Sequence, residues 1–471
     1  MRRLLFLLLL LVVSCTNPYS SIDTPPAPRP KGDSEVISYI DKRLEEEYYW
    51  LDEVLERRAY FDRSLSWDKY LPHALSRLRT NDDDGYFNSQ GQRGYYSYIR
   101  EIGSTTRAEV MGFGIALHYT IIVMDSENRR YGFVIESVYP GSPAEMAGMQ
   151  RGDIITMVDS RYLDSSNYVA MFNGIVANSL SSVKIEYLRR SEGKTSHTVT
   201  LSKGAYHETP VVYSDIIELE GYDKKIGYLV YTSFESEYDQ ELMDVLQGFA
   251  TAGIGELILD LRCNGGGALY SAVKLCSALV PRGYESQTLC SIKRNKNNKK
   301  LPEVSEFALS DTGAVLNLER LTVICSGNSA SASEIVIMGL RGLDFPVRLI
   351  GQTTEGKNCG MDVTHKRIGS KEYEYAPITF MCFNAKGFGD WGEGIAPDVD
   401  LTTENEYGVS DGYYPLPYTQ WGDKNHDIAL AVALADITGA KLSTSTRAIS
   451  NEDITIATTM ARPVMGTRLY E

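Results

Sequence analysis

Two short segments of the sequence contain residues that could carry out acyl transfer. Residues 260–267 read Asp-Leu-Arg-Cys-Asn-Gly-Gly-Gly, and residues 327–334 read Gly-Asn-Ser-Ala-Ser-Ala-Ser-Glu. Each lies between an apolar run and a helical pattern, which predicts a strand, a small-residue loop and a helix. Backbone N–H groups at a helix start lack partners and suit an anion, including the oxyanion of acyl transfer. A hydroxyl in the second segment could therefore attack a carbonyl whose oxygen is held by N–H groups from both loops.

A serine nucleophile needs a base, and Lys357 is the candidate. The chain has only six histidines, and none lies in a recognisable triad motif. Lys357 follows a predicted strand at 347–350, and a parallel strand ending beside the serine loop could return the lysine to the nucleophile. Its amine must be neutral to accept a proton, so we expect it to be desolvated, which pushes a lysine pKa down. Ser-Lys pairs are an established variant of this chemistry.

Simpler interpretations of the same residues stay open at this stage. Ser331 and Glu334 have the spacing of a capping box, in which the serine only begins a helix. Ser329 and Ser333 are rival nucleophiles, and Lys357 could be an exposed loop lysine. We expect Asp260 and Arg262 to pair near the end of the sheet, in a structural role.

The start of the sequence resembles a bacterial lipoprotein signal. Two arginines precede an apolar run at 4–13, which is about half the length that a membrane-spanning helix needs. Ser14 then precedes Cys15, so we expect residues 1–14 to be a signal peptide and Cys15 to carry the lipid. The alternative is ordinary signal-peptidase cleavage. Residues 15–32 are proline-rich and should form an extended tether.

The rest of the chain divides by pattern into three regions and a C-terminal tail at 446–471. Residues 33–107 predict a small helical domain, with one long amphipathic helix between about Val36 and Leu55 and a second helix at 67–78. The acidic run at 81–85 lacks the ligand spacing of a calcium loop and should be a solvated turn.

Residues 108–205 predict a β-rich domain, with strands at 131–138 and 154–158 and a short helix at 144–149. Residues 206–445 predict an α/β domain. Strands are expected at 257–259, 321–325 and 347–350, and helices at 269–279 and 332–341. This alternation favours a largely parallel sheet covered by helices.

The two loop segments also resemble motifs of the C-terminal processing peptidases, or tail-specific proteases. A lysine in a Gly-Lys pair stands 26 positions after the middle serine of Ser-Ala-Ser-Ala-Ser-Glu, and residues 394–399 also match. The resemblance implies a crotonase-like α/β core with an inserted PDZ domain. It assigns the nucleophile to Ser331, the base to Lys357, and the oxyanion donors to the N–H of Ala332 and of Gly266 or Gly267.

The PDZ resemblance depends on Gly112, Phe113, Gly114 and Ile115, followed by the stretches at 141–144 and 152–155. The first stretch resembles a carboxylate-binding loop, whose backbone N–H groups can hold a peptide C-terminus. A bound substrate would then add a strand to the edge of the domain.

Three positions depart from the family pattern. Gly265 stands where the family often has proline, and Met361 stands where some members have a glutamine that supports the lysine. Asp344 is the nearest residue to an accessory acidic position.

Composition narrows the function further. A net charge of −15 argues against nucleic-acid binding and against electrostatic attachment to anionic lipid. The cysteines after Cys15 form no C-x-x-C pair, so we expect no zinc site, and the chemistry needs no metal or organic cofactor.

The sequence thus predicts a lipid-anchored serine endopeptidase of the bacterial cell envelope. We expect it to face the periplasm, with surface exposure as an option, and to cleave exported proteins recognised by their C-terminal tails. The alternative is a catalytically silent, PDZ-containing scaffold that binds such tails. The oligomeric state is not predicted.

Overall fold

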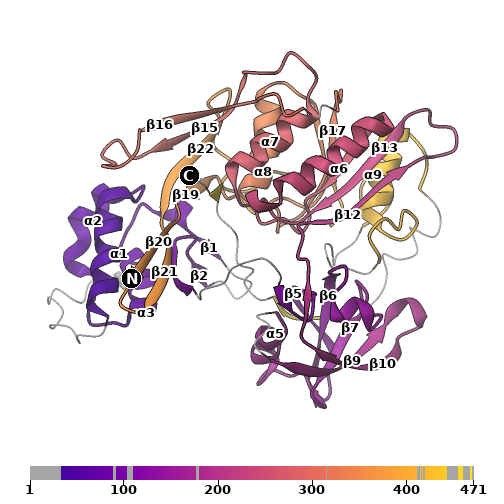
Figure 1. Cartoon of the computed structure of the whole chain (residues 1–471), viewed down its shortest axis with the longest axis horizontal. Coiled ribbons are helices and arrows are strands. Elements are labelled where there is room, and N and C mark those ends of the chain that lie inside the picture. Colours follow the sequence, from indigo (N-terminus) through magenta and orange to yellow (C-terminus); the bar gives the residue numbers. More distant parts are fainter. Residues whose placement is uncertain are drawn as a thin grey trace, which may run out of the picture.

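The computed structural model describes residues 33–87, 92–102, 110–176, 180–313, 316–410, 414, 416, 419–442, 455–459 and 467–468. Cys15, the predicted signal peptide and the tether lie outside the described residues. Figure 1 shows N-terminal helices and a β-rich domain flanking a larger α/β core. Among the described residues, no helix combines the length and apolarity needed to cross a bilayer.

A six-stranded sheet forms the centre of the core, in the order β12-β13-β14-β17-β18-β23. All neighbouring pairs from β13 to β23 are parallel, and β12 is antiparallel to β13. The strands are β12 (Val211–Ile217), β13 (Lys225–Tyr231), β14 (Ile254–Asp260), β17 (Leu321–Cys325), β18 (Val347–Gly351) and β23 (Val399–Asp400). The predicted parallel sheet is therefore confirmed.

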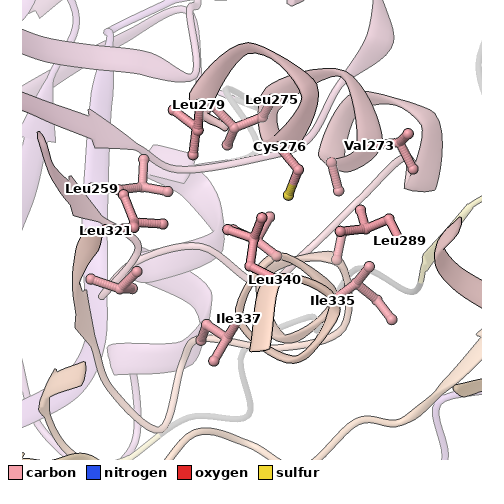
Figure 2. Packing of buried hydrophobic residues seen from close by; sticks show 14 of the residues in the cluster. Leu259, Val273, Leu275, Cys276, Leu279, Leu289, Leu321, Ile335, Ile337 and Leu340 are labelled. Carbon is pink, nitrogen blue, oxygen red and sulfur yellow. The ribbon is translucent and has the colours of Figure 1, made fainter. Parts of the chain in front are cut away.

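Helices cover both faces of this sheet. One face packs against α6 (Asp239–Ala252), α7 (Leu269–Leu279) and α8 (Ala332–Gly342). The other face packs against α9 (Ile428–Thr438), whose side chains join Ile258 and Ile324 in a second apolar cluster. Figure 2 shows side chains of α7 and α8 packed between the two helices, with Cys276 among them. The predicted fold class, an α/β core with a β-rich domain, is confirmed.

A second sheet of the core has the order β16-β15-β22-β19-β25. Its strands are β15 (Thr288–Arg294), β16 (Val304–Ala308), β19 (Cys359–Met361), β22 (Ile378–Asn384) and β25 (Thr467–Arg468). Strand β19 begins two residues after Lys357, so this sheet fixes the chain that leaves the lysine.

The N-terminal helical region corrects one prediction. The single long helix is divided into α1 (Ser34–Glu47) and α2 (Leu51–Arg57), followed by α3 (Trp67–Leu75). Tyr48 is extended, with φ −58° and ψ 140°, and the Tyr49 N–H donates to the Ile378 carbonyl at 2.8 Å. A contact distant in sequence thus ends a helix that its own apolar pattern would continue.

Two strands of the core form a sheet with a strand of the N-terminal region. Strands β3 (Tyr98–Ile102), β21 (Lys371–Ala376) and β20 (Thr364–Ile368) form one antiparallel sheet. Met361 and Tyr375 lie in the same apolar cluster as the buried face of α1. Short strands β1 (Tyr86–Phe87) and β2 (Arg93–Gly94) pair nearby.

The β-rich domain has a sheet in the order β10-β9-β7-β6-β5-β24. Its elements are β5 (Ile115–Asp125), β6 (Arg130–Val138), α4 (Pro143–Met146), β7 (Ile154–Val158), β8 (Arg161–Tyr162), α5 (Tyr168–Val176), β9 (Ser182–Arg189) and β10 (Thr195–Ser202). Strands β4 (Val110–Gly112) and β11 (Gly204–Tyr206) pair where the chain enters and leaves the domain. Strand β24 (Thr455–Thr459) comes from the C-terminal tail, where the sequence predicted no element.

A buried ion-pair network joins the loop after β14 to the start of α9. The Arg262 guanidinium pairs with Asp260 at 2.6 Å and with Asp427, the N-cap of α9, at 2.8 Å. The expected Asp260–Arg262 pair is confirmed. The guanidinium group of Arg262 lies 5.3 Å from the ring centroid of Trp421, and the guanidinium group of Arg151 in the β-rich domain lies 3.3 Å from the same ring. The β-rich domain is thereby connected to the loop that carries the glycine run.

Candidate active site

The topology brings the candidate residues to one edge of the central sheet. Strands β14, β17 and β18 are parallel neighbours, with Asp260 opposite Ile324 and Cys325 opposite Gly351. The loops that follow them hold the glycine run, the serine run and Lys357, so all three leave the sheet at the same edge. This is the edge at which open α/β sheets bind ligands.

One buried carboxylate connects the serine loop to the lysine loop. Glu334 Oε2 accepts the N–H of Ser331 at 2.8 Å and the N–H of Lys357 at 2.9 Å. Its Oε1 accepts the N–H of Gly356 at 2.8 Å and the hydroxyl of Thr354 at 2.6 Å. Burial raises the pKa of Glu334 to about 7, although these hydrogen bonds oppose the rise. The backbones of both candidate catalytic residues therefore depend on the same side chain.

The three serines of the run differ in what their hydroxyls do. Ser329 Oγ donates to the Leu261 carbonyl at 2.7 Å, and Ser333 Oγ donates to the Asn264 carbonyl at 2.9 Å. Both hydroxyls therefore fasten the serine loop to the glycine loop. This structural role counts against Ser329 and Ser333 as the nucleophile.

Ser331 also has an unusual backbone. Its φ is 59° and its ψ is −112°, a sparsely populated region for a residue with a Cβ. Such strain is typical of nucleophiles held at a sharp turn from a strand to a helix. Because the Glu334 carboxylate accepts its N–H, Ser331 begins α8 as a capping residue as well. The capping role and the nucleophile role are therefore compatible.

The structure of the glycine loop distinguishes Gly266 from Gly267 as the candidate oxyanion donor. The Gly266 N–H donates to Asn264 Oδ1 at 2.9 Å, which engages it within the loop. Gly267 has φ 141°, and a Cβ there would overlap the Phe234 carbonyl oxygen, so the position requires glycine. Ala332 is the first residue of α8, where an N–H lies outside the helical pattern. This arrangement favours Gly267 over Gly266 as the partner of Ala332, and the assignment stays a prediction.

Lys357 is buried, with 1% of its surface exposed, so the exposed-loop interpretation is wrong. Its Nζ lies 4.2 Å from the ring centroid of Tyr96, which belongs to the N-terminal region. The Tyr96 hydroxyl donates to Glu355 Oε1 at 2.9 Å, and burial raises the pKa of Glu355. The N-terminal region therefore forms one wall of the lysine site.

Asp84 adds a buried carboxyl group to that wall and corrects the predicted solvated turn at 81–85. It accepts the Tyr48 hydroxyl at 2.7 Å, the Ser97 hydroxyl at 2.6 Å and the Ser97 N–H at 2.8 Å. Burial raises the pKa of Asp84 to about 6, opposed by these bonds and by the charge of Lys357. Nothing in the spacing of Asp84 or Tyr96 connects either residue to Lys357, so sequence reasoning missed both.

The departures from the family pattern have different structural outcomes. Met361 is fully buried in the apolar cluster shared with α1. It therefore contributes apolar packing at the position where a glutamine could form a hydrogen bond to the lysine. Asp344 is exposed and pairs with Lys386, so it is not part of this site. Gly265 is buried in the glycine loop.

The loop at 112–115 lies at the start of β5. Phe113 is fully buried, and its carbonyl accepts the Ala144 N–H at 3.0 Å. Gly114 has φ 74°, and a Cβ there would overlap the Ser142 side chain, so this position requires glycine. Ile115 is the first residue of β5.

Comparison with known proteins identifies these parts. Residues 225–401, which include both Ser331 and Lys357, match the model of peptidase family S41, and residues 134–172 match a PDZ domain. The α/β core that holds the candidate site is therefore similar to peptidase family S41, and part of the β-rich domain is similar to a PDZ domain.

Individual relatives agree with this assignment. A probable CtpA-like serine protease of Staphylococcus epidermidis is 25% identical over 355 residues, which cover 74% of this chain and 66% of that protein. A Staphylococcus aureus protein of the same description is 24% identical and covers 62% of this chain, which spans 54% of its length. The chain thus spans two thirds or less of these curated relatives. An S41 protease structure from Bacteroides fragilis has a TM-score of 0.64 and 23% identity, covers 85% of this chain and 97% of its own, and shares the fold.

We expect Glu334→Gln to destabilise the protein by about 2–5 kcal/mol. A side-chain amide has one acceptor oxygen, so either the Ser331 and Lys357 N–H groups or the Gly356 N–H and Thr354 hydroxyl would face an N–H₂ group, and at least one backbone N–H would lose its acceptor. Urea unfolding at pH 8 measures the change. The control is Glu372→Gln in β21, a partly exposed carboxylate that pairs with the exposed Arg367 at 3.6 Å, where we expect a change within about 0.5 kcal/mol. Equal stabilities of Glu334→Gln and the parent would contradict the role given to this carboxylate.

Proposed function

We propose that this protein is a serine endopeptidase with a Ser331–Lys357 dyad, acting on polypeptides that its PDZ domain recognises by their C-terminal tails. The observation that carries the proposal is the shared hydrogen bonding of both backbones to Glu334. It fixes a strained serine and a buried lysine on adjacent loops at one sheet edge. The S41 family and the CtpA-like relatives support the same activity.

In the first half of the reaction, the Ser331 hydroxyl attacks the scissile carbonyl carbon while the Lys357 amine takes its proton. The carbonyl oxygen becomes an oxyanion, which the N–H groups of Gly267 and Ala332 would stabilise. The C–N bond then breaks, and Lys357 returns the proton to the leaving amine. The carboxyl half of the cut bond stays on Ser331 as an ester.

In the second half, water attacks the ester and gives a proton to Lys357, and the Ser331 oxygen leaves and recovers a proton. A neutral amine is required at the start of each half. Burial of Lys357 supports this requirement, because desolvation disfavours a charged amine. Ser331 is also fully buried, so substrate access requires part of the surrounding chain to move.

We also propose that Cys15 carries a lipid and that the enzyme acts in the bacterial cell envelope, facing the periplasm. The support is the apolar run at 4–13 followed by Ser14 and Cys15. Growth of the producing cells with an alkyne-labelled fatty acid tests whether Cys15 carries a lipid. We expect label on the parent protein and none on Cys15→Ala, and equal labelling of the two would contradict it.

Replacing either dyad residue should abolish hydrolysis. We expect Ser331→Ala and Lys357→Ala each to lower kcat/KM by at least about 10³-fold for a peptide with an apolar C-terminus, since the two act as a unit. The matched controls are Ser329→Ala and Ser333→Ala, which lose a loop hydrogen bond and should keep activity within about tenfold. Cleavage by Ser331→Ala at the parental rate, or cleavage by none of the proteins, would overturn the proposal and favour the silent scaffold.

The pH profile tests the link between Asp84 and the base. The rising limb of kcat/KM should follow deprotonation of Lys357, and the negative charge of Asp84 favours the protonated amine. Asp84→Asn removes that charge and should move the rising limb to lower pH by about 0.5–1 pH unit. Asp83→Asn is the neighbouring control, because Lys357 is not among the groups that affect the pKa of Asp83. An unmoved limb in Asp84→Asn would rule out this coupling.

A further inference from the structure

The PDZ sheet ends in a strand contributed by a segment more than three hundred residues further along the chain than the strand it pairs with. Strand β24 pairs antiparallel with β5, placing Thr455 opposite Val123 and Thr459 opposite Thr120. Among the described residues, β5 has only β6 and β24 as neighbours, so β24 occupies what would otherwise be the open edge of this sheet.

The direction of β24 matches that of a PDZ ligand. Because the pairing is antiparallel, the segment advances from Val123 toward the start of β5 at Ile115. The loop at 112–115 lies there. A peptide that adds a strand to a PDZ domain runs in the same sense, with its carboxylate directed at the loop.

Side-chain packing adds to the backbone pairing. Ala457 packs against the apolar cluster of the PDZ domain, which includes Phe133 and Phe172. Ile456 is 46% exposed. The segment therefore combines main-chain pairing with inward and outward residues, as a strand added at a sheet edge does.

The chain after β24 also reaches the catalytic core. Strand β25 pairs in parallel with β19, placing Thr467 opposite Gly360 and Arg468 opposite Met361. These partners follow Lys357 by only a few residues. The same tail thus contacts the PDZ edge and the strand that leaves the candidate base.

We propose that residues 455–459 are an internal ligand of the PDZ domain, and that an incoming polypeptide tail must displace them. The backbone N–H and C=O groups of residues 120–123 that pair with β24 cannot form hydrogen bonds with a second strand at the same time. The external partner that fits this edge is an extended, uncharged segment rich in Thr, Ile and Ala, as β24 itself is. This inference concerns binding and does not depend on the proposed catalytic residues.

Peptide binding tests the inference. The probe is a fluorescent synthetic peptide with the sequence of residues 451–459 and a free carboxylate, and fluorescence anisotropy gives its Kd. All proteins carry Ser331→Ala, so that cleavage cannot remove the probe. The variants are the full chain, the chain ended after residue 442, Thr458→Pro and the isosteric control Thr458→Val.

We expect the truncated chain and Thr458→Pro to bind the probe at least about tenfold more tightly than the full chain. A tethered competitor acts at an effective concentration on the order of 1 mM, and proline breaks strand pairing. Thr458→Val keeps a β-branched residue and should bind like the full chain. The proline variant separates loss of β24 from any wider effect of the truncation.

Equal affinity of the full chain, Thr458→Pro and the truncated chain would overturn the inference, as would tighter binding by Thr458→Val than by Thr458→Pro. Activity of the proteins with Ser331 restored reports separately on the proposed function. A chain that hydrolyses peptides but shows no gain in binding refutes the internal ligand alone. A chain that gains binding without hydrolysis refutes the catalytic proposal alone.

Discussion

Taking a carboxyl group out of water is costly, and in this fold four hydrogen bonds offset that cost at Glu334. Two of the donors are the backbone N–H groups of Ser331 and Lys357. The carboxylate therefore fixes the distance between the start of the helix that carries the candidate nucleophile and the loop that carries the candidate base. The parallel strands β17 and β18 bring those segments near each other, and Glu334 fixes their relative position.

The other walls of the site come from distant parts of the chain. Asn264 and Leu261 accept hydrogen bonds from the serine loop and hold it against the glycine loop. Tyr96 and Asp84 close the lysine side from the N-terminal region. Arg262, Trp421 and Arg151 connect the glycine loop to the PDZ domain.

Local patterns predicted the elements that depend on local residues. Helix α7 (Leu269–Leu279) and strand β17 (Leu321–Cys325) have the bounds that the sequence indicates, because apolar runs and small-residue loops define them. The break at Tyr48 depends on a hydrogen bond from Tyr49 to Ile378, which no local pattern contains. Asp84 and Tyr96 were missed for the same reason, since folding alone brings them to Lys357. Strand β24 pairs with a domain that its own sequence does not identify.

Covalent labelling tests the central claim most directly, namely that Glu334 holds one activated serine against a buried lysine. The protein is reacted with a fluorophosphonate, and the adduct is located by mass spectrometry of its peptides. We expect a single adduct on Ser331, with labelling strongly slowed in Lys357→Ala and in Glu334→Gln. An adduct on Ser329 or Ser333, or labelling of Ser331 at an unchanged rate without Lys357, would contradict the account.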